Sequence, residues 1–363
     1  MHATPPLRVS APGRICLFGE HQDYLHLPVI PCAISLRVGL EGRFEPERRV
    51  HLNLPDIGSE TAFGLEGEQP YVQARDYFRS GFNVMHRLGY TFGSGFDVSV
   101  HGEIPINSGT SSSSALLVAW IDFLARFSDQ RRILDAETVA RLAHEAEVVE
   151  FREPGGMMDH FSTAVGRVLY LDFEPRVSVT PLSAPLGRFV LGDSGEPKDT
   201  QGILARVKDR VIAIAGQLRQ TDPGFRLGAL TPEGVQAYKP VLSAWDFALL
   251  EGTVTNHAIT LCARAALEAE VLDHALIGRL LNAHQDVLRD VLAISTPKID
   301  RMLSAALEAG ALGGKINGSG GGGCMFAYAP DRAEAVAEAI EAEGGKAYIV
   351  TPAEGVKSEG LTQ

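Results

Sequence analysis

A run of four serines, Ser111 to Ser114, directly precedes an apolar helical pattern that begins at Ala115. The first backbone N–H groups of a helix have no partner inside the helix, and with the helix dipole they form a site for phosphate. The residues before the run, Asn107 to Thr110, are small or polar and would let a phosphate approach the backbone. Since capping a helix needs only one serine, the run predicts a phosphate-binding loop. The alternative is a simple cap or a flexible serine-rich loop.

A second segment, Gly318 to Gly323, holds five glycines in six positions. It contains a literal G-x-G-x-x-G, but a helical pattern ends before it and a strand-like pattern follows, which is not the order of a dinucleotide fingerprint. A P-loop also fails, because Ile316 follows Lys315 where serine or threonine is required. A flexible linker is one remaining interpretation. The strand-like pattern that follows at once favours a close approach of this backbone to another backbone or to phosphates.

A third segment, Ala11 to Ile34, gathers polar groups between apolar strand-like runs. These groups are Arg14, Glu20, His21, Asp23 and Tyr24, placed around Gly19. Neighbouring donors and acceptors of this kind can bind sugar hydroxyls. Any one of them alone also fits a polar surface loop.

The elements that must position these segments follow from periodicity. Strands are expected at 15–18, 29–44, 96–104 and 167–173, and helices at 115–127 and 136–151. The second half is more helical, with helices expected at 200–220, 241–267, 275–294 and 297–310, and it ends in a strand–helix–strand pattern. A composition shift near 180–190 predicts a domain boundary there. The pattern predicts an α+β protein.

The composition is that of a globular protein that needs neither metal nor disulfide for stability, with 363 residues, 45% hydrophobic and 21% charged. A net charge of −12 argues against non-specific nucleic-acid binding. No apolar run approaches the ~20 residues that span a bilayer, and the N-terminus does not resemble a secretory signal. We therefore expect a cytoplasmic protein with no membrane contact. The four cysteines (Cys16, Cys32, Cys262 and Cys324) form no zinc pattern and are expected to be buried as small apolar side chains.

Taken together, the segments resemble the GHMP kinases, and the resemblance covers nearly the whole chain. "PGRICLFGEHQDY" is similar to the galactokinase signature P-G-R-x-x-L-x-G-E-H-x-D-Y, and "PINSGTSSSSA" is similar to the phosphate loop of the family. "GGKINGSGGGGC" resembles the third family motif, and "AEVVEFREPGGMMDHF" resembles the galactokinase segment that carries the catalytic aspartate.

The resemblance implies a two-domain GHMP kinase fold. Residues 1–185 would form an N-terminal ribosomal-S5-like α/β domain with the phosphate loop, and residues 186–363 a C-terminal ferredoxin-like α+β domain with added helices. ATP would bind between the domains, with its phosphates on Asn107, Ser108, Gly109, Thr110, Ser111, Ser112, Ser113 and Ser114.

The resemblance also implies a role for individual side chains. Asp159 falls at the catalytic base and Arg14 beside the transferred phosphate. Ser113 and Glu147 fall at the Mg²⁺ ligands, and Glu20, His21 and Asp23 where galactokinases hold the sugar. Read without the family, Asp159 also fits a helix N-cap. Glu147 read in the same way fits a solvated acidic helix face.

This sequence departs from galactokinases at several positions. Leu25 and Leu27 stand in place of the usual Asn-x-Gly, and His160 follows Asp159 in place of Gln. The family's S-E-Y-N-x-R-R segment is replaced by residues 192–208. There Asp193, Ser194, Lys198 and Asp199 are candidates for bordering the substrate, and Lys198 would suit a uronic acid or a phosphosugar.

The function predicted from the sequence is ATP-dependent phosphorylation of a monosaccharide hydroxyl, the anomeric one first, with Mg²⁺. One alternative is a GHMP kinase that acts on a non-sugar alcohol such as mevalonate or homoserine. Another is a sensor that binds sugar and ATP without turnover, against which the presence of Asp159 and Arg14 argues. The sequence leaves homodimer formation open.

Overall fold

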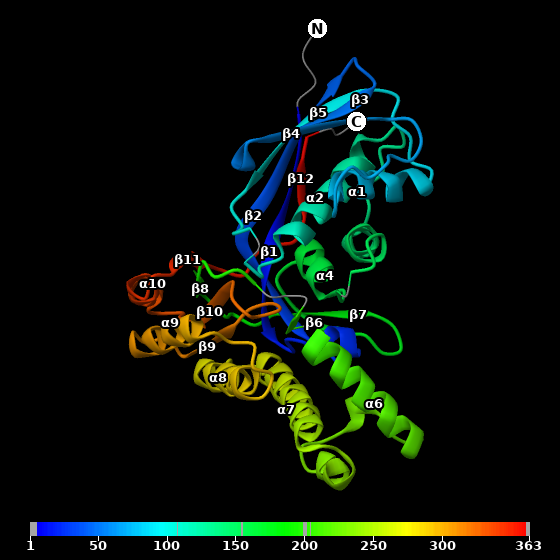
Figure 1. Ribbon diagram of the computed structural model, residues 1–363. Coiled ribbons are helices and arrows are strands. Elements are labelled where there is room, and N and C mark those ends of the chain that lie inside the picture. The colour runs from blue at the N-terminus through cyan, green and yellow to red at the C-terminus, as the bar shows by residue number, and fades with distance from the viewer. Residues whose placement is uncertain (1–5, 107, 154, 199–201, 204, 361–363) are drawn as a thin grey trace.

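The computed structural model of the chain describes residues 6–106, 108–153, 155–198, 202–203 and 205–360. Its strands form two separate sheets, a long one that runs from the top of the view down to β6 and β7 and a smaller one to the lower left (Figure 1). The expected α+β, two-domain fold is confirmed. The boundary near residue 185 stays a prediction.

The first sheet has eight strands in the order β12-β1-β2-β5-β3-β4, with β6 pairing with both β2 and β7. All of its pairs are antiparallel except β3 with β5. The strands are β1 (Leu7–Phe18), β2 (Ile30–Glu45), β3 (Arg49–Leu54), β4 (Ser59–Gly64), β5 (Gly95–Gly102), β6 (Val168–Asp172), β7 (Ser178–Leu182) and β12 (Lys357–Glu359).

Helix α2 (Ser112–Phe127) is the central helix of this half of the molecule. It packs against β1, β2, α1 (Tyr77–Arg87), α3 (Ala136–His144) and α4 (Met158–Val165), so nearly all of its side chains are buried. Trp120 stacks on Phe123, and Phe123 stacks on Phe127. The serine run that opens α2 is therefore held by a rigid apolar core.

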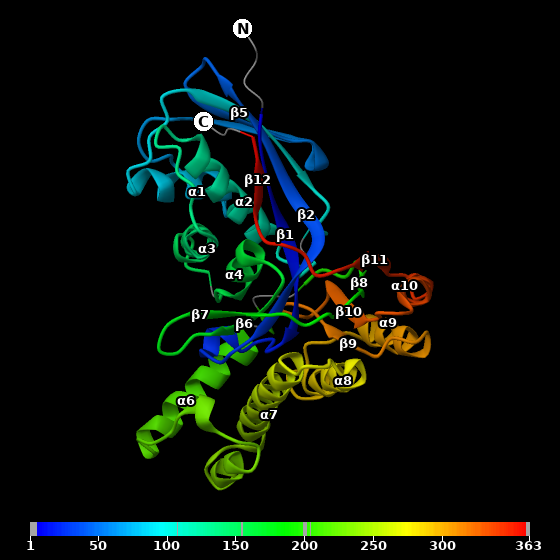
Figure 2. The same cartoon turned by 180° about the vertical axis from the view of Figure 1, so that it is seen from behind.

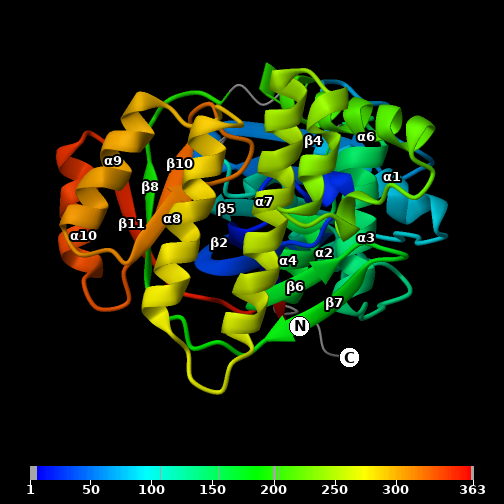
Figure 3. The same cartoon turned by 90° about the horizontal axis from the view of Figure 1, so that it is seen from below.

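The second sheet has the order β11-β8-β10-β9, and every pair is antiparallel. Its strands are β8 (Phe189–Asp193), β9 (Gly313–Ile316), β10 (Cys324–Tyr328) and β11 (Lys346–Val350). Helices α8 (His274–Asp290), α9 (Pro297–Glu308) and α10 (Ala333–Ala342) pack on it, and α7 (Ala244–Leu267) lies beside α8 when the molecule is seen from below (Figure 3). Helix α6 (Arg210–Thr221) packs on α7.

Several short helical turns complete the described chain. The 3₁₀ turns are η1 (Asp23–Leu25), η2 (Pro55–Ile57), η5 (Leu227–Ala229) and η6 (Gly234–Val241), and the π-helical turns are η3 (Glu145–Val149) and η4 (Ala205–Asp209).

One apolar cluster joins the two halves of the molecule. It combines Ile15 and Phe18 of β1 with Phe189 of β8 and Phe326 of β10, all fully buried. The polar segments at the lower end of β1 are thereby fixed against the second sheet.

The cysteine prediction needs one correction. Cys16, Cys32 and Cys324 are buried, but Cys262 is exposed, because it lies on the outward face of α7. All four are free thiols. Within the described ranges, no helix is both long enough and apolar enough to cross a membrane.

Candidate active site

A cavity of about 540 Å³ collects the motif residues at the junction of the two halves. It is lined by Arg14 of β1, by η3 and by the start of α4. Three loops also line it: residues 19–24 (the signature loop), residues 108–114 (the serine loop) and residues 318–323 (the glycine-rich loop). Lys198 also lines it. A cavity of this size and mixed polarity suits a small ligand.

Arg14 and Asp159 form an ion pair inside this cavity, with 2.8 Å between Arg14 Nε and Asp159 Oδ1. Arg14 is buried and also donates a hydrogen bond to the carbonyl oxygen of Gly109. Burial would raise the pKa of Asp159, but the Arg14 charge and its hydrogen bond hold that pKa below its usual value. Asp159 lies in the first turn of α4, whose N-cap is Met157, so the capping alternative is not observed. Asp159 is a carboxylate with 30% of its side chain exposed, directed at a cavity.

The serine loop presents a helix start to the same cavity. Ser111 has a left-handed backbone with φ of 61°, and α2 begins at Ser112. The cavity is lined by Ser108, Gly109, Ser111, Ser112, Ser113 and Ser114. Thr110 does not line it, because its buried hydroxyl is bonded to Ser108 Oγ at 2.8 Å. Asn107 lies outside the described residues.

Glu147 is held on η3 beside the serine loop. Its Oε2 accepts hydrogen bonds from Ser114 Oγ at 2.7 Å and from His160 Nε2 at 2.8 Å. Burial opposes ionisation, but these contacts and Ser113 lower the pKa of Glu147, so it is a carboxylate.

The donor set around Glu147 fits Mg²⁺. The described residues contain no cluster of three His, Cys, Asp or Glu side chains that could hold a metal alone. Mg²⁺ is usually bound by one or two protein oxygens, with waters and substrate phosphates completing its shell. The Glu147 carboxylate and the Ser113 hydroxyl, which both line the cavity, supply such oxygens.

The polar residues of the signature loop, Glu20, His21 and Asp23, differ in whether their side chains are free to bind a ligand. Both oxygens of Glu20 are engaged, one by Lys315 Nζ at 2.6 Å and the other by the backbone N–H of Gly318 at 3.0 Å. His21 Nε2 donates to the carbonyl oxygen of Ser319 at 3.0 Å, and its Nδ1 lies 2.6 Å from Tyr24 Oη. Burial lowers the pKa of His21, so it is neutral. Glu20 and His21 line the cavity but are committed to contacts within the protein.

Asp23 is the signature carboxylate that stays available to a ligand. It accepts the backbone N–H of Tyr24 at 2.9 Å. Burial and the nearby Asp159 charge raise the pKa of Asp23 to about 6. Its Oδ2 lies against Gly156, where a Cβ would come within 1.9 Å, so only glycine fits there.

The glycine-rich run serves contact between two backbones. A Cβ on Gly318 would lie 2.9 Å from the Gly109 carbonyl oxygen, and one on Gly323 would lie 2.6 Å from that of Ser108. Asn317 adds two hydrogen bonds of 2.8 Å, accepting the N–H of Cys16 and donating to Gly109 O. The predicted close approach of backbone to backbone is therefore observed, and it brings the three motifs together.

The segment after β8 contributes less than expected. Asp193 does not line the cavity, because its carboxylate accepts the backbone N–H of Gly195 at 2.9 Å and closes the turn after the strand. Ser194 Oγ donates to the Gly323 carbonyl oxygen at 2.6 Å and is structural. Asp199 lies outside the described residues. Lys198 is the member of this group that lines the cavity, near Arg14 and Asp159, and burial and Arg14 lower its pKa.

The cavity also has an apolar part that no sequence motif predicted. This part is lined by Val38, Leu54, Ile57, Val100, Ile104, Ile106 and Leu116, together with Tyr77. Such a surface suits a flat aromatic base, but apolar residues spread over several strands and loops leave no motif. Lys315 was also overlooked as the partner of Glu20, because it follows two glycines and lies 295 positions from Glu20, which leaves no local signal.

Comparison with known proteins identifies the family of this chain. Residues 76–167 match "GHMP kinases N terminal domain", residues 263–346 match "GHMP kinases C terminal", and residues 1–42 match "Galactokinase galactose-binding signature". A mevalonate kinase of Pyrococcus horikoshii is 30% identical over 364 residues, covering 97% of this chain and 96% of that one. The chain belongs to the GHMP kinases.

This GHMP kinase also has galactokinase relatives. A galactokinase of Haemophilus influenzae is 27% identical over 373 residues, covering 97% of this chain and 95% of the relative. The fold matches that of Lactococcus lactis galactokinase complexed with galactose, with a TM-score of 0.83, 23% identity and coverage of 97% and 95%. Methanococcus jannaschii mevalonate kinase matches with a TM-score of 0.73, 17% identity and coverage of 96% and 98%. The protein is an ATP-dependent kinase of galactokinase-like type.

Proposed function

We propose that this GHMP kinase transfers the terminal phosphoryl group of ATP to a monosaccharide hydroxyl, the anomeric C1 hydroxyl first. The observation that carries the proposal is the Arg14–Asp159 pair, which lies in one cavity with the serine loop and with Asp23. The match of residues 1–42 to the galactose-binding signature supports a sugar acceptor. Cytoplasmic location and homodimer formation stay predictions.

Each group in the cavity has its own role in the proposed reaction. The backbone N–H groups at the start of α2 bind the phosphates of the nucleotide. Asp159 accepts a hydrogen bond from the acceptor hydroxyl, orients it and takes its proton. The acceptor oxygen bonds to the γ-phosphorus as the bond from that phosphorus to the bridging oxygen breaks and ADP leaves. Arg14 neutralises charge on the phosphoryl oxygens during transfer. Asp23 accepts hydrogen bonds from other sugar hydroxyls.

Ser113 and Glu147 would hold Mg²⁺. Mg²⁺ held there would supply positive charge against the negative charge of the nucleotide phosphates. Ser114 and His160 keep the Glu147 carboxylate in place.

The second candidate is a non-sugar alcohol that carries a carboxylate, such as mevalonate. Two observations favour it, the 29–30% identity to several mevalonate kinases and the presence of a lysine, Lys198, in the cavity. Asp23 and Asp159 oppose it, since two carboxylates near the acceptor repel a third.

The test is ADP release from ATP and Mg²⁺ with a panel of aldoses, uronic acids, phosphosugars, mevalonate and homoserine. We expect one sugar to give turnover, and Asp159→Asn to abolish it. Asp290→Asn is the matched control, because Asp290 is also paired with an arginine (2.7 Å from Arg289) but lies on α8 outside the cavity. Turnover with mevalonate or homoserine would favour the second candidate. Sugar binding with no turnover on the whole panel would make the protein a sensor.

Lys198→Met separates neutral from anionic acceptors. If the acceptor is a uronic acid or a phosphosugar, its KM rises in this variant while the KM for ATP changes little. An unchanged KM for an anionic acceptor would remove Lys198 from the binding site.

A further inference from the structure

The proposed reaction depends on two carboxylates, Asp159 and Glu147. His160 is the sequence neighbour of the first and is hydrogen-bonded to the second. His160 follows Asp159 directly in the first turn of α4 and is 2% exposed. Its Nε2 lies 2.8 Å from Glu147 Oε2. Because a carboxylate only accepts hydrogen bonds, Nε2 must carry the hydrogen.

The same carboxylate oxygen receives a second hydrogen bond. Ser114 Oγ donates to Glu147 Oε2 at 2.7 Å. Because Ser114 and His160 both donate to Oε2, Oε1 is the oxygen that these two contacts leave for a cation. Ser113, which also lines the cavity, adds a hydrogen bond to this carboxylate.

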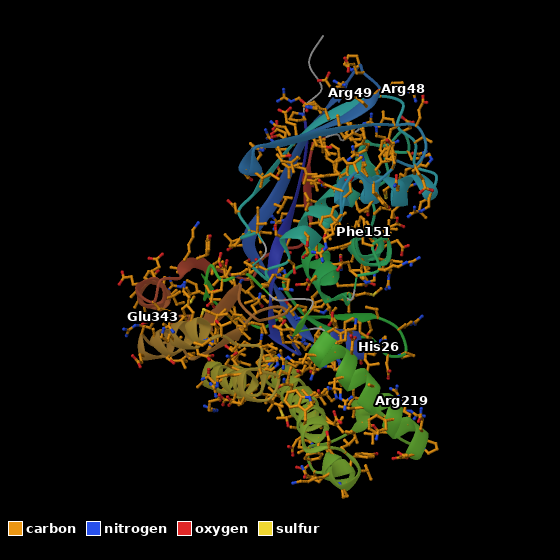
Figure 4. All side chains as sticks on the ribbon, viewed as in Figure 1. His26, Arg48, Arg49, Phe151, Arg219 and Glu343 are labelled. Carbon is orange, nitrogen blue, oxygen red and sulfur yellow. The ribbon has the colours of Figure 1, made fainter. Side chains whose placement is uncertain are left out.

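The backbone that carries Glu147 is fixed separately from its side chain. Ser80 Oγ donates to the carbonyl oxygen of Ala146. Phe151, which is labelled in Figure 4, lies two residues after η3. Its ring contacts those of Tyr71 and Tyr77, with ring centroids 5.2 and 5.9 Å apart. These contacts fix where the side chain starts, but a glutamate has three further torsions. Its carboxylate is fixed by His160 and Ser114.

We propose that His160 is a positioning residue, which holds Glu147 by Oε2 and so leaves Oε1 available to bind Mg²⁺. The inference rests on the proposed function. Since His160 and Asp159 are neighbours on one helical turn, the start of α4 sets both carboxylates at once. Asp159 is turned to Arg14, and His160 sets Glu147 against the serine loop.

The test compares binding of ADP and of MgADP by titration calorimetry, without any sugar. In the unmodified protein we expect Mg²⁺ to strengthen ADP binding. His160→Ala should reduce the affinity for MgADP by about 10–100-fold, the usual cost of removing a partner of a metal ligand, and leave the affinity for metal-free ADP unchanged. His160→Gln keeps an N–H donor and should restore most of the Mg²⁺ effect.

His257→Ala is the control for removing a buried histidine. His257 Nε2 bonds the Gly228 carbonyl oxygen at 3.2 Å, and the residue does not line the cavity. Ser114→Ala removes the other donor to Glu147 Oε2 and should weaken MgADP more than ADP, which provides a test if His160→Ala does not fold.

The outcomes separate the inference from the proposed function. An equal Mg²⁺ effect in His160→Ala and the unmodified protein would overturn the positioning role, and so would an equal loss of ADP and MgADP. Failure of His160→Gln to restore the effect would also overturn it. A protein that binds neither ADP nor MgADP in its unmodified form would overturn the proposed function itself.

Discussion

Asp23 and Asp159 face one cavity but ionise at different pH. Arg14 holds the pKa of Asp159 below its usual value, so this carboxylate is charged at any pH near neutrality. Asp23 has no such partner, and burial and the Asp159 charge raise its pKa to about 6. The two residues can therefore be distinguished by the pH dependence of catalysis.

We predict that the KM for a neutral sugar rises as pH falls through about 6, the pKa of Asp23. A raised carboxyl pKa means that the charged, accepting form is present above pH 6 and is lost below it. If the protonated form does not bind sugar, KM rises about tenfold between pH 7 and pH 5. Steady-state kinetics over this range would show it, and Asp23→Asn should give a KM without this step. A pH step that persists in Asp23→Asn would assign it to another group.

Lys315 and Glu20 form an ion pair that is closed off from solvent, with side-chain exposures of 0% and 2%. The ammonium also donates to the carbonyl oxygens of Cys16 at 2.9 Å and of Ile316 at 2.8 Å. Such a pair is costly to break, because the partner left behind is a buried charge.

We predict that Lys315→Met lowers the free energy of unfolding by about 3–5 kcal/mol. The double variant with Glu20→Gln should regain much of this loss, since it leaves no unpaired charge. Chemical denaturation would measure both. The exposed pair of Arg8 and Glu41 is the control, and Arg8→Met should change stability little. A Lys315→Met protein as stable as Arg8→Met would contradict the interpretation.

At the level of the elements, the serine loop and the glycine-rich loop lie very close together. At the point of closest approach, between Gly109 and Gly318, there is no room for a side chain on either residue. Gly109 and Gly318 both have positive φ, at 89° and 80°. A Cβ on either would lie under 3.0 Å from the backbone of the other loop. The serine loop and the glycine-rich loop thus act as one unit.

Gly318→Ala is predicted to weaken both stability and nucleotide binding. The backbone conformation costs about 1–2 kcal/mol for an L-residue, and the clash with Gly109 displaces the serine loop. Gly58→Ala is the matched control, since Gly58 has φ of 60° but no atom within 4 Å of its Cβ position. Thermal unfolding should show a larger loss of stability in Gly318→Ala than in Gly58→Ala, because only the former adds a clash to the backbone strain. ADP titration should show a loss of binding in Gly318→Ala alone. Normal ADP binding by Gly318→Ala would mean that the loops move independently.

How far the sequence predicts these elements depends on how local their signal is. The helix opened by the serine run and the long strands β1 and β2 follow from periodicity and lie close to their expected positions. Helix α1 was overlooked, although Phe78, Phe82 and Met85 have helical spacing. β9 was hidden by Gly313 and Gly314, which pack against α8 and β10.

The same distinction applies to the candidate site, where motifs predicted some residues and no local pattern predicted others. Arg14, Asp159 and the serine loop were found through motifs, whereas the Lys315–Glu20 pair joins residues 295 positions apart and no local pattern carries it. Asp193 was misplaced, because the sequence does not reveal that its carboxylate closes the next turn.

On the scale of the whole molecule, the end of the chain returns to the first sheet. β12 lies along β1, with Arg8, Val9 and Ser10 opposite Glu359, Ser358 and Lys357 (Figure 2). The first sheet is thus complete only when residues from both ends of the described chain have met.

We predict that a chain shortened by residues 357–363 folds but is less stable by about 1–3 kcal/mol, since each lost backbone hydrogen bond costs on the order of 1 kcal/mol. The opened edge of β1 should also favour aggregation. Thermal unfolding and light scattering would test both effects. Lys357→Thr, which keeps the backbone pairing, should behave like the unmodified protein. An equally stable and equally monodisperse shortened chain would show that β12 contributes nothing.

The pairing of β1 with β12 also bears on how the protein is made. A ribosome adds about 5–20 residues per second, so the growing chain exposes the edge of its first strand on the order of tens of seconds before the partner emerges. During that time the nascent first domain has an open edge that a neighbouring chain could occupy. Arg8 and Ser10, polar residues on that stretch, make such pairing less favourable. Only a chain translated through residue 359 can close the sheet, so a stalled or truncated product would be marked by its open edge.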